Sequence, residues 1–265
     1  MRPKNRSRKM EQMTICIDIS RCTACRACQV ACKNWNQLKA EQTENRGSHE
    51  NPPDLSGQTW NRIVFMETRI SNDGIDWAFF SERCRHCDDP PCIEASESVP
   101  GAIIRHDSGA VLFTEKTQQL EYDDVLSYCP YDIPRKDKAT GRINKCTMCV
   151  DRVTHGLKPA CVTACSTGAL NFGPRPEMLR FIEARIKALG GDANIYPGED
   201  HNTIWILPEN RKRYPLAQAM EVRRPYRRAA RGKSGAVLAG VLLTAGLVKF
   251  RERVQPNPSE EKAGQ

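Results

Sequence analysis

The sequence predicts an α+β fold whose interior is cross-linked by metal-bound cysteines. Three observations support this: the cysteines gather in tight groups, short apolar segments alternate between strand and helix patterns, and apolar content is low for a chain that relies on a hydrophobic core alone. The chain has 265 residues, of which 13 are Cys and 39% are hydrophobic, so it has room for one or two domains. Groups of the form Cys-x-x-Cys favour metal ligation over a disulfide framework.

The first half of the chain is predicted to combine short strands with one helix. ICID, residues 15–18, forms an apolar strand that leads into the first cysteine group. Residues 28–38 suit a helix. Residues 39–59 are polar and contain Pro-Pro and Gly, which indicates a long loop. Strands are expected at 62–68 and near 76–80.

The second half continues the mixture. Residues 101–114, GAIIRHDSGAVLFT, have two apolar runs around Asp-Ser-Gly, which predicts a hairpin. Residues 176–191 have helical apolar spacing, with Pro near the start and Gly at the end. NTIWIL, 202–207, is the last predicted strand, and 211–233 is a strongly basic linker.

The two ends of the chain lie outside this mixture. Residues 1–13 read as a basic tail, and no apolar run follows MRPKNRSRKM, so no secretory signal is expected. SGAVLAGVLLTAGLV, residues 234–248, spans about 22 Å as a helix against a hydrocarbon core of about 30 Å, but flanking lysines can extend it. We therefore predict a single membrane helix over 234–250, with a tail at 251–265; a buried soluble helix or a frayed tail is the alternative.

Twelve of the cysteines fall into four groups. The groups are Cys22, Cys25, Cys28 and Cys32; Cys84, Cys87 and Cys92; Cys129 alone; and Cys146, Cys149, Cys161 and Cys165. The first group has the Cys-x2-Cys-x2-Cys-x3-Cys spacing of two-cluster ferredoxins, in which three thiolates hold one 4Fe–4S cluster and the fourth serves its neighbour. Zinc ribbons also use Cys-x-x-Cys pairs, but three consecutive ligands overfill a zinc half-site.

Cys129 stands in CPYD, the usual end of such a motif, without the three cysteines that normally precede it. The stretch is long enough to hold the motif, so its ligands look substituted rather than deleted. Counted with the usual spacing, the substituted positions are Gln119, Tyr122 and Val125 before Cys129, and Ser96, four residues after Cys92.

The order of these groups resembles the iron–sulfur beta subunit of molybdenum- or tungsten-bispterin oxidoreductases, and most of all the formate dehydrogenase beta subunit. The matching stretches are CRACQVACKNWNQL, CRHCDDPPC, CPYDIPR and KCTMCVDRV…GLKPACVTAC, with ENPPDLS…TW after the first group. The resemblance covers about residues 14–207. It implies a polyferredoxin-like domain at 14–210, built of two ferredoxin-like modules with pseudo-twofold pairing and long loops: 14–80 with 140–175, and 81–139.

The resemblance also implies that each cluster takes three cysteines from one group and the last cysteine of the paired group. Cluster A then uses Cys22, Cys25, Cys28 and Cys165; cluster B uses Cys146, Cys149, Cys161 and Cys32; cluster C uses Cys84, Cys87, Cys92 and Cys129. A fourth cluster would need the four substituted positions, so we expect three 4Fe–4S clusters. Cys16 is left over and is interpreted as a buried structural thiol.

Several side chains near the cysteines are open to two interpretations. Arg26, Arg85 and Lys145 each adjoin a ligand and either raise a reduction potential or are solvated cations. Packing is favoured over an electron-path role for the tryptophans Trp35, Trp60 and Trp77. His86 and His106 are not expected to be ligands, because Cys129 completes the nearby set. The 39–59 loop either docks a catalytic partner or is solvated.

The resemblance implies an electron-transfer subunit that relays electrons from a bispterin catalytic subunit, which oxidises formate, toward a membrane cytochrome b or quinone site. The sequence holds no catalytic constellation of its own. Two alternatives stay open: the electron subunit of another bispterin oxidoreductase or a hydrogenase, and clusters that serve only as structural staples.

Net charge bears on two further expectations. Three clusters at roughly −2 each offset most of the formal charge of +8, so the basic balance is weak evidence for nucleic acid and none is expected as a partner. The cations of 211–233 flank the apolar segment, which fits contact with membrane lipid. Their excess favours a cytoplasmic iron–sulfur domain, but some family members cross folded with a partner's signal, so both sides remain open.

Overall fold

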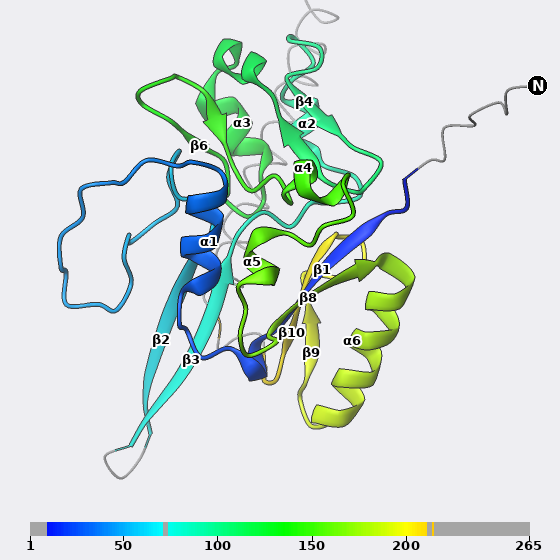
Figure 1. Ribbon diagram of the computed structural model, residues 1–265. Helices are drawn as coiled ribbons and strands as arrows, with labels where there is room; N and C mark the ends of the chain where they lie inside the picture. The colour runs from blue at the N-terminus through cyan, green and yellow to red at the C-terminus, as the bar shows by residue number, and fades with distance from the viewer. Residues whose placement is uncertain (1–9, 71–73, 211–213, 215–265) are drawn as a thin grey trace, which may run out of the picture. The chain divides into compact units, whose positions relative to one another are not determined.

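The computed structural model describes residues 10–70, 74–210 and 214 (Figure 1). The predicted membrane helix at 234–250, the tail at 251–265 and nearly all of the basic linker lie outside the described residues. Within the described residues, no helix is both long and apolar enough to cross a bilayer. The mixed α+β class is confirmed.

A four-stranded sheet forms one end of the described unit. Its strand order is β8 (Leu170–Pro174), β1 (Met13–Asp18), β10 (Thr203–Leu207) and β9 (Asn194–Tyr196). β1 pairs parallel with β10 and antiparallel with β8. The strands predicted at 15–18 and 202–207 are confirmed as the two central strands, because their continuous apolar runs are buried on both faces.

Each face of this sheet is covered by a different element. Helix α6 (Arg175–Leu189) lies against one face, where Cys16 packs with Ile182 and Ile204 (Figure 1). The helix predicted at 176–191 is thereby confirmed, and Gly190 caps it with a φ of +63°. On the other face, Phe80 stacks on Trp205 at 5.1 Å between ring centroids.

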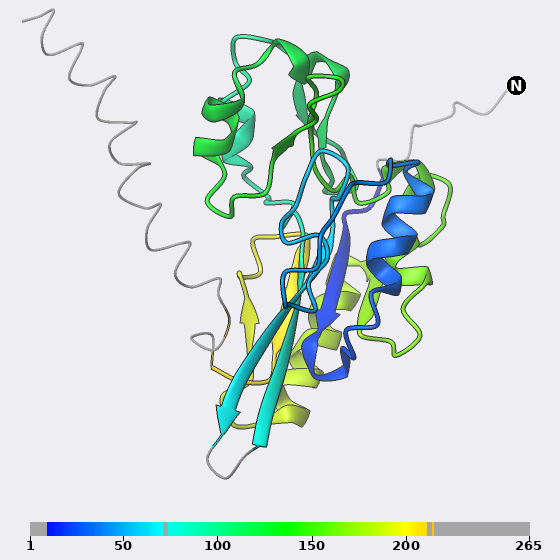
Figure 2. The ribbon, with the colours of Figure 1, turned by 90° about the vertical axis from the view of Figure 1, so that its left-hand side faces the viewer.

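Phe80 belongs to a long antiparallel hairpin made of β2 (Arg62–Ile70) and β3 (Gly74–Glu82). Both strands are expected from the sequence, and both extend beyond the expected bounds. Figure 2 shows the hairpin running along the sheet and projecting past it. The strand β3 ends directly before the second cysteine group, so packing of Phe80 under the sheet also positions that group.

Short helices carry the first and fourth cysteine groups. Following η1 (Ile19–Arg21), α1 (Ala27–Trp35) packs against α5 (Ala160–Thr163), and α4 (Val150–Val153) precedes α5. Helix α1 ends three residues before the predicted end, because Asn36 Nδ2 donates to the Cys32 carbonyl oxygen at 2.8 Å and terminates the helix.

The remaining elements surround a separate apolar cluster in the upper part of Figure 1. They are α2 (Pro91–Glu94), β4 (Ile103–Arg105), β5 (Val111–Phe113), η2 (Glu115–Gln119), α3 (Tyr122–Tyr128), β6 (Arg135–Lys136) and β7 (Ile143–Asn144). The hairpin predicted at 101–114 is confirmed as β4–β5. Gly109, with a φ of +86°, allows the reversal between its strands.

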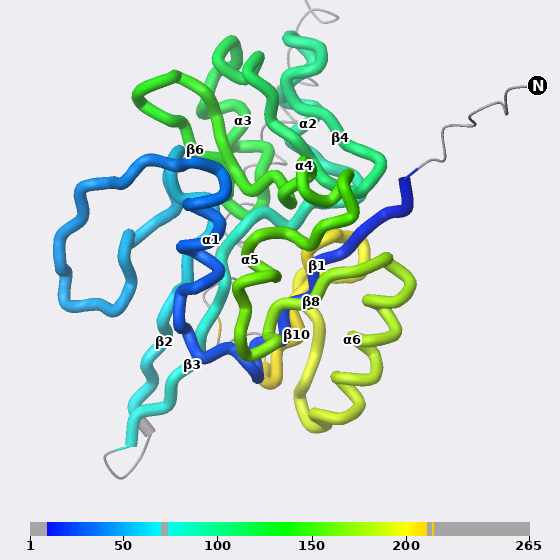
Figure 3. The backbone as a smooth tube through the Cα atoms, viewed as in Figure 1, coloured from blue at the N-terminus to red at the C-terminus, as the bar shows by residue number. Residues whose placement is uncertain are grey.

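The 39–59 loop contains no helix and no ladder strand, as predicted, yet it is tied to the body of the protein at several points (Figure 3). Near α1, Lys33 pairs with Glu41 at 3.1 Å. Farther along, Asp54 pairs with Arg135 at 3.0 Å, and Gln58 Nε2 donates to Asp137 Oδ2 at 3.1 Å. The loop therefore joins the α1 region to β6.

Candidate iron–sulfur cluster sites

The same backbone bend follows the first cysteine of the first, second and fourth cysteine groups. Two residues after the first cysteine of each of these groups stands a non-glycine residue with positive φ: Ala24 at 53°, His86 at 48° and Met148 at 57°. The bend turns a backbone N–H toward the first sulfur: His86 N donates to Cys84 Sγ and Met148 N to Cys146 Sγ, both at 3.4 Å. N–H donors to sulfur stabilise the thiolate form that binds iron.

Set A gathers around Cys22. Burial raises the pKa of the Cys22 thiol, the Ala24 N–H opposes this, and Cys28, Cys165 and Cys25 raise it further as charged neighbours. The first cysteine group therefore meets the last cysteine of the fourth group. Cys25 is exposed, so this set reaches the protein surface.

Set B gathers around Cys32. Burial raises the pKa of the Cys32 thiol well above its usual value, and Cys146, Cys161 and Cys149 raise it further. Burial likewise raises the pKa of Cys146 to about 11 and that of Cys149 to about 12. These thiols are protonated at neutral pH without iron, so binding of a cluster must release protons.

Set C gathers around Cys87. Burial raises the pKa of this thiol, followed by the effects of Cys84, Cys129 and Cys92. The four cysteines line one hollow, whose other walls include Pro90, Pro91, Tyr131, Ile133 and Lys145. A largely apolar hollow that presents four thiols fits a cluster better than it fits water.

The three sets form a row. Cys161 and Cys165 both act on Cys28, which links sets A and B. Cys84 acts on Cys146, which links sets B and C. Cys84 and Cys146 also share a small apolar cluster with Leu55. Set B therefore lies between the other two.

Three buried cations adjoin these sets. Arg83 Nη1 donates to Cys161 Sγ at 3.0 Å. Arg85 lies within 4.9–5.8 Å of four aromatic ring centroids and lowers the pKa of Cys129, against the larger raising effect of burial. Lys145 Nζ lies 4.8 Å from the centroid of the Phe113 ring, and its charge lowers the pKa of Cys92 against the larger raising effect of burial. Buried positive charge complements a cluster with net negative charge.

The four substituted positions carry packing side chains instead of thiols. Val125 is fully buried in the apolar cluster, Tyr122 packs against that cluster, and the Ser96 hydroxyl donates to the Ile93 carbonyl oxygen at 2.8 Å. Gln119 is exposed at the end of η2. The apolar cluster consists of Ala102, Ile103, Val111, Phe113, Leu120, Val125 and Ile143.

The other side chains singled out from the sequence occupy varied positions. Trp35 is 43% exposed and stacks with Arg152, 4.1 Å away, whereas Trp60 Nε1 donates to the Gly57 carbonyl oxygen at 2.9 Å. Trp77 belongs to an aromatic group with Phe65 on the β2–β3 hairpin. The remaining three are Arg26, half-buried over the Phe65 ring; His86, whose Nδ1 accepts from Val111 N; and His106, bonded to Ser108.

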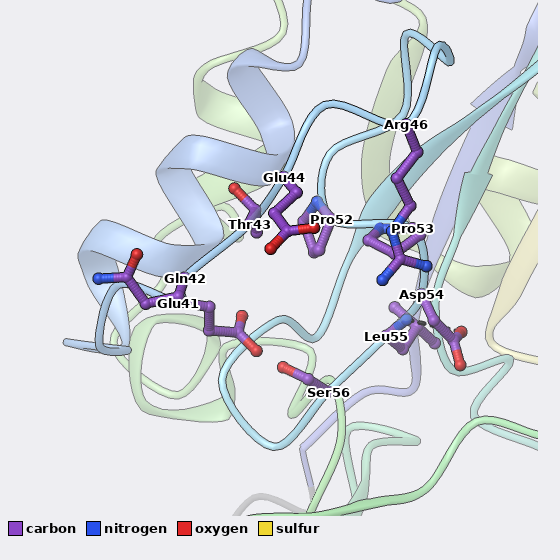
Figure 4. A pocket seen from close by; sticks show the side chains of 10 residues that line it. All are labelled: Glu41, Gln42, Thr43, Glu44, Arg46, Pro52, Pro53, Asp54, Leu55 and Ser56. Atoms are coloured by element: carbon purple, nitrogen blue, oxygen red, sulfur yellow. Dashed lines mark hydrogen bonds between the residues drawn. The ribbon is translucent and has the colours of Figure 1, made fainter.

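A second hollow lies within the 39–59 loop (Figure 4). Its lining mixes charged and apolar side chains, among them Glu44, Arg46 and Leu55. Glu41 faces inward, accepting from Thr59 Oγ1 and pairing with Lys33. The lining of the hollow includes no cysteine, and one lining residue, Leu55, also packs with Cys84 and Cys146.

Sequence reasoning missed two polar residues that contact the sets, Arg83 and Asn61. Both are almost fully buried, and Asn61 lowers the pKa of the Cys28 thiol against the larger raising effect of burial. The available signal was the position of Arg83 directly before Cys84, at the end of a segment that begins with the apolar run WAFF. A charged residue there is costly to bury unless it has a partner.

The three sets fit 4Fe–4S clusters. Each provides four thiols, N–H donors to sulfur and a neighbouring buried cation, as the preceding contacts show. In a cubane each thiolate binds a different iron, so the thiols need not converge on one point. Consistent with this geometry, no group of three or more His, Cys, Asp or Glu among the described residues converges on a single metal-ion site.

Comparisons with known proteins agree with these sites. Residues 75–175 match the 4Fe-4S dicluster domain family. The chain is 48% identical over 204 residues to formate dehydrogenase subunit beta of Megalodesulfovibrio gigas, covering 75% of this chain and 94% of that protein. It is 45% identical over 206 residues to formate dehydrogenase 2 subunit beta (cytochrome c-553) of Nitratidesulfovibrio vulgaris, with the same coverage.

Less similar relatives include subunits of both formate dehydrogenase and another oxidoreductase. The nitrate-inducible formate dehydrogenase iron-sulfur subunit of Escherichia coli is 42% identical over 187 residues, which are 69% of this chain and 63% of that protein. A subunit of the anaerobic dimethyl sulfoxide reductase of the same organism is only 32% identical over 163 residues, which are 61% of this chain and 73% of that subunit. The high identity and coverage on the formate side decide between these branches: the chain belongs to the formate dehydrogenase beta subunit family of iron–sulfur electron-transfer proteins.

Proposed function

We propose that this chain carries electrons through three 4Fe–4S clusters, held by sets A, B and C, between a bispterin catalytic subunit that oxidises formate and a membrane acceptor. The observation that carries the proposal is the row of sets. Each set has four thiols from two cysteine groups, and set B adjoins both of the others through Cys28–Cys161 and Cys84–Cys146. Electron transfer requires such a succession of neighbouring centres.

The substituted site lies at the end of this row. Cys84 of set C faces set B, whereas Cys92 packs against the apolar cluster that contains Val125. The apolar cluster therefore adjoins set C on a different side from set B. Replacing a terminal centre shortens the row by one step, and electrons still pass from A to C without crossing a gap.

The acceptor and the location of the protein are further parts of the proposal. The apolar segment at 234–250 would anchor the chain to the membrane beside a cytochrome b or quinone site, with lysines at both of its ends near lipid headgroups. One relative carries cytochrome c-553 in its name. A cytochrome c is therefore the second candidate acceptor.

The decisive experiment first counts the clusters and then asks whether formate reduces them. We expect about twelve iron atoms and about twelve sulfides per chain after anaerobic purification, and reduction of the clusters when formate is added to the chain with its catalytic subunit. About sixteen iron atoms would overturn the assignment of the substituted site. Four or fewer with bound zinc, or clusters that formate does not reduce, would overturn the electron-transfer role.

A further inference from the structure

One buried cation, Arg83, lies between sets A and B. Its Nη1 donates to Cys161 Sγ of set B at 3.0 Å, and its positive charge also acts on Cys28 of set A and Cys146 of set B. The residue is 1% exposed and forms no ion pair with a carboxylate in the part of the chain that the structure describes. The charged groups that act most strongly on Arg83 are therefore cysteines of two different sets.

A chain of hydrogen bonds connects the remaining donors of Arg83 to Asn61, which lies beside Cys28. Arg83 Nε and Nη2 donate to Ser81 Oγ at 3.1 and 2.6 Å. Ser81 Oγ donates in turn to Asn61 Oδ1 at 3.0 Å. Burial raises the pKa of the Cys28 thiol, and the Asn61 side chain beside it lowers that pKa.

The direction of these bonds is fixed by chemistry. A guanidinium only donates, so Ser81 Oγ must accept from Arg83 and use its own proton for Asn61 Oδ1. This leaves the Asn61 Nδ2 protons facing away from Ser81, and Nδ2 has no hydrogen-bond partner among the residues described, so it is free to donate to a sulfur of the cluster that Cys28 would hold. Along this series of hydrogen bonds, each residue donates to the next one in the direction from Arg83 to Asn61.

We propose that Arg83, with Ser81 and Asn61, is a positioning residue that raises the reduction potentials of clusters A and B together. This inference rests on the proposed function, because it assumes that both clusters are present. Reduction adds negative charge to a cluster, and a buried cation with N–H donors to its sulfurs stabilises the reduced state. The interaction is strong because solvent screens it little at a buried site.

The test is a potentiometric titration of the full chain in its native complex, followed by electron paramagnetic resonance with chemical mediators. In Arg83→Gln, we expect two of the three midpoint potentials to fall. At a fixed potential the reduced-to-oxidised ratio of each falls at least tenfold, equivalent to about 59 mV for one electron. In Asn61→Leu, only one of these two falls, because the direct Arg83–Cys161 contact remains.

Arg26→Gln is the matched control. Arg26 also adjoins a ligand of set A in sequence, but it is only half-buried and stacks on Phe65, so water screens its charge. We expect its loss to change each ratio less than threefold. Equal shifts of all three clusters in Arg83→Gln, no shift of any, or an equal effect of Arg26→Gln would overturn the proposal.

If Arg83→Gln loses its clusters, two milder variants test the proposal instead. Arg83→Lys keeps the charge without the two bonds to Ser81, and we expect a fall smaller than tenfold in both clusters. Asn61→Leu keeps Arg83 itself, and unchanged potentials in this variant would overturn the proposal. Because mediators rather than formate drive the titration, a complex that formate does not reduce would contradict the proposed function alone.

Discussion

The two cysteine-bearing regions of the molecule differ in what fills their interiors: one is filled mainly by candidate cluster ligands, the other by ligands and an apolar cluster. The sheet region, which carries the first and fourth cysteine groups, has eight thiols in sets A and B with Arg83 between them. Residues 84–144 contain the β4–β5 hairpin and are called the hairpin region here. This region has the four thiols of set C and, beside them, the apolar cluster around Val125. One region thus keeps two candidate cluster sites, and the other keeps one.

We infer from this difference that side-chain packing takes the place of a cluster as a cross-link around the substituted positions. Seven residues of the apolar cluster are almost fully buried. Burial of a Val, Ile, Leu or Phe side chain contributes about 1.5–3 kcal/mol. We therefore expect the backbone around the substituted positions to stay folded without iron, and the loops of set C, with their buried thiols, to depend more on their ligands.

The comparison predicts that Cys129→Ser has the largest effect. Cys129 is the only ligand that the hairpin region brings to set C from beyond the second cysteine group. Its loss should remove the cluster of set C and lower the iron content from about twelve to about eight atoms per chain. Iron and sulfide analysis measures this directly.

Cys16→Ala serves as the control for that measurement. Cys16 is fully buried under α6, away from all three sets, and burial raises its pKa. Its removal should cost about 1 kcal/mol of stability and leave the iron content unchanged. Normal iron content in Cys129→Ser, or a loss in Cys16→Ala, would contradict the assignment of set C.

Val125→Ala tests the other half of the comparison. The substitution leaves a cavity in the apolar cluster, which should lower the free energy of unfolding by about 2 kcal/mol and the thermal midpoint by roughly 5 °C. Iron content should stay the same, because no thiol is touched. Val30→Ala, at a site 65% exposed, is the control and should change the midpoint by about 1 °C. Iron loss in Val125→Ala would mean that a ligand depends on this packing.

Lys145→Met separates set C from the other two sets. Lys145 Nζ donates to the carbonyl oxygens of Val111 and Cys146 and favours the Cys92 thiolate. Removing this charge should lower only the potential of cluster C, by a shift on the order of 59 mV, a tenfold change in the reduced fraction. Lys116→Met, an exposed cation of the same region, should leave the potential in place. A fall in all three potentials would show that the charge acts globally.

Sequence predicted much of this arrangement where the signal was local. The apolar runs at 15–18 and 202–207, the turn within 101–114 and the Pro-to-Gly limits of 176–191 each lie within one short segment. The strands β8 and β9 were missed, because each is short and is defined by pairing with a distant strand. The sequence does not predict α3, because this seven-residue helix is short and Val125 is its one buried residue.

The candidate sites divide in the same way. Cysteine spacing is a strong local signal, and together with the family resemblance it predicts the three ligand sets, an assignment that stays a prediction. Arg83, Ser81 and Asn61 could not, because their bonds join residues on β3 and before β2 that only the fold brings to the sulfurs. The sequence also does not reveal which cysteine Lys145 affects. Lys145 directly precedes Cys146 of set B, yet its charge lowers the pKa of Cys92 of set C against the larger raising effect of burial.

The smallest predicted effect concerns the loop that joins the two regions. Asp54 pairs with Arg135 at 3.0 Å, but the Asp54 side chain is 58% exposed, so the pair should contribute only about 0.5 kcal/mol. Asp54→Asn should therefore lower the thermal midpoint by about 1 °C at low salt and by nothing measurable at about 1 M salt. Glu97→Gln removes an exposed carboxylate of the hairpin region and should have no effect at either salt concentration. A larger, salt-independent loss in Asp54→Asn would show that the loop holds the two regions together through packing of Leu55 and Gly57 rather than through charge.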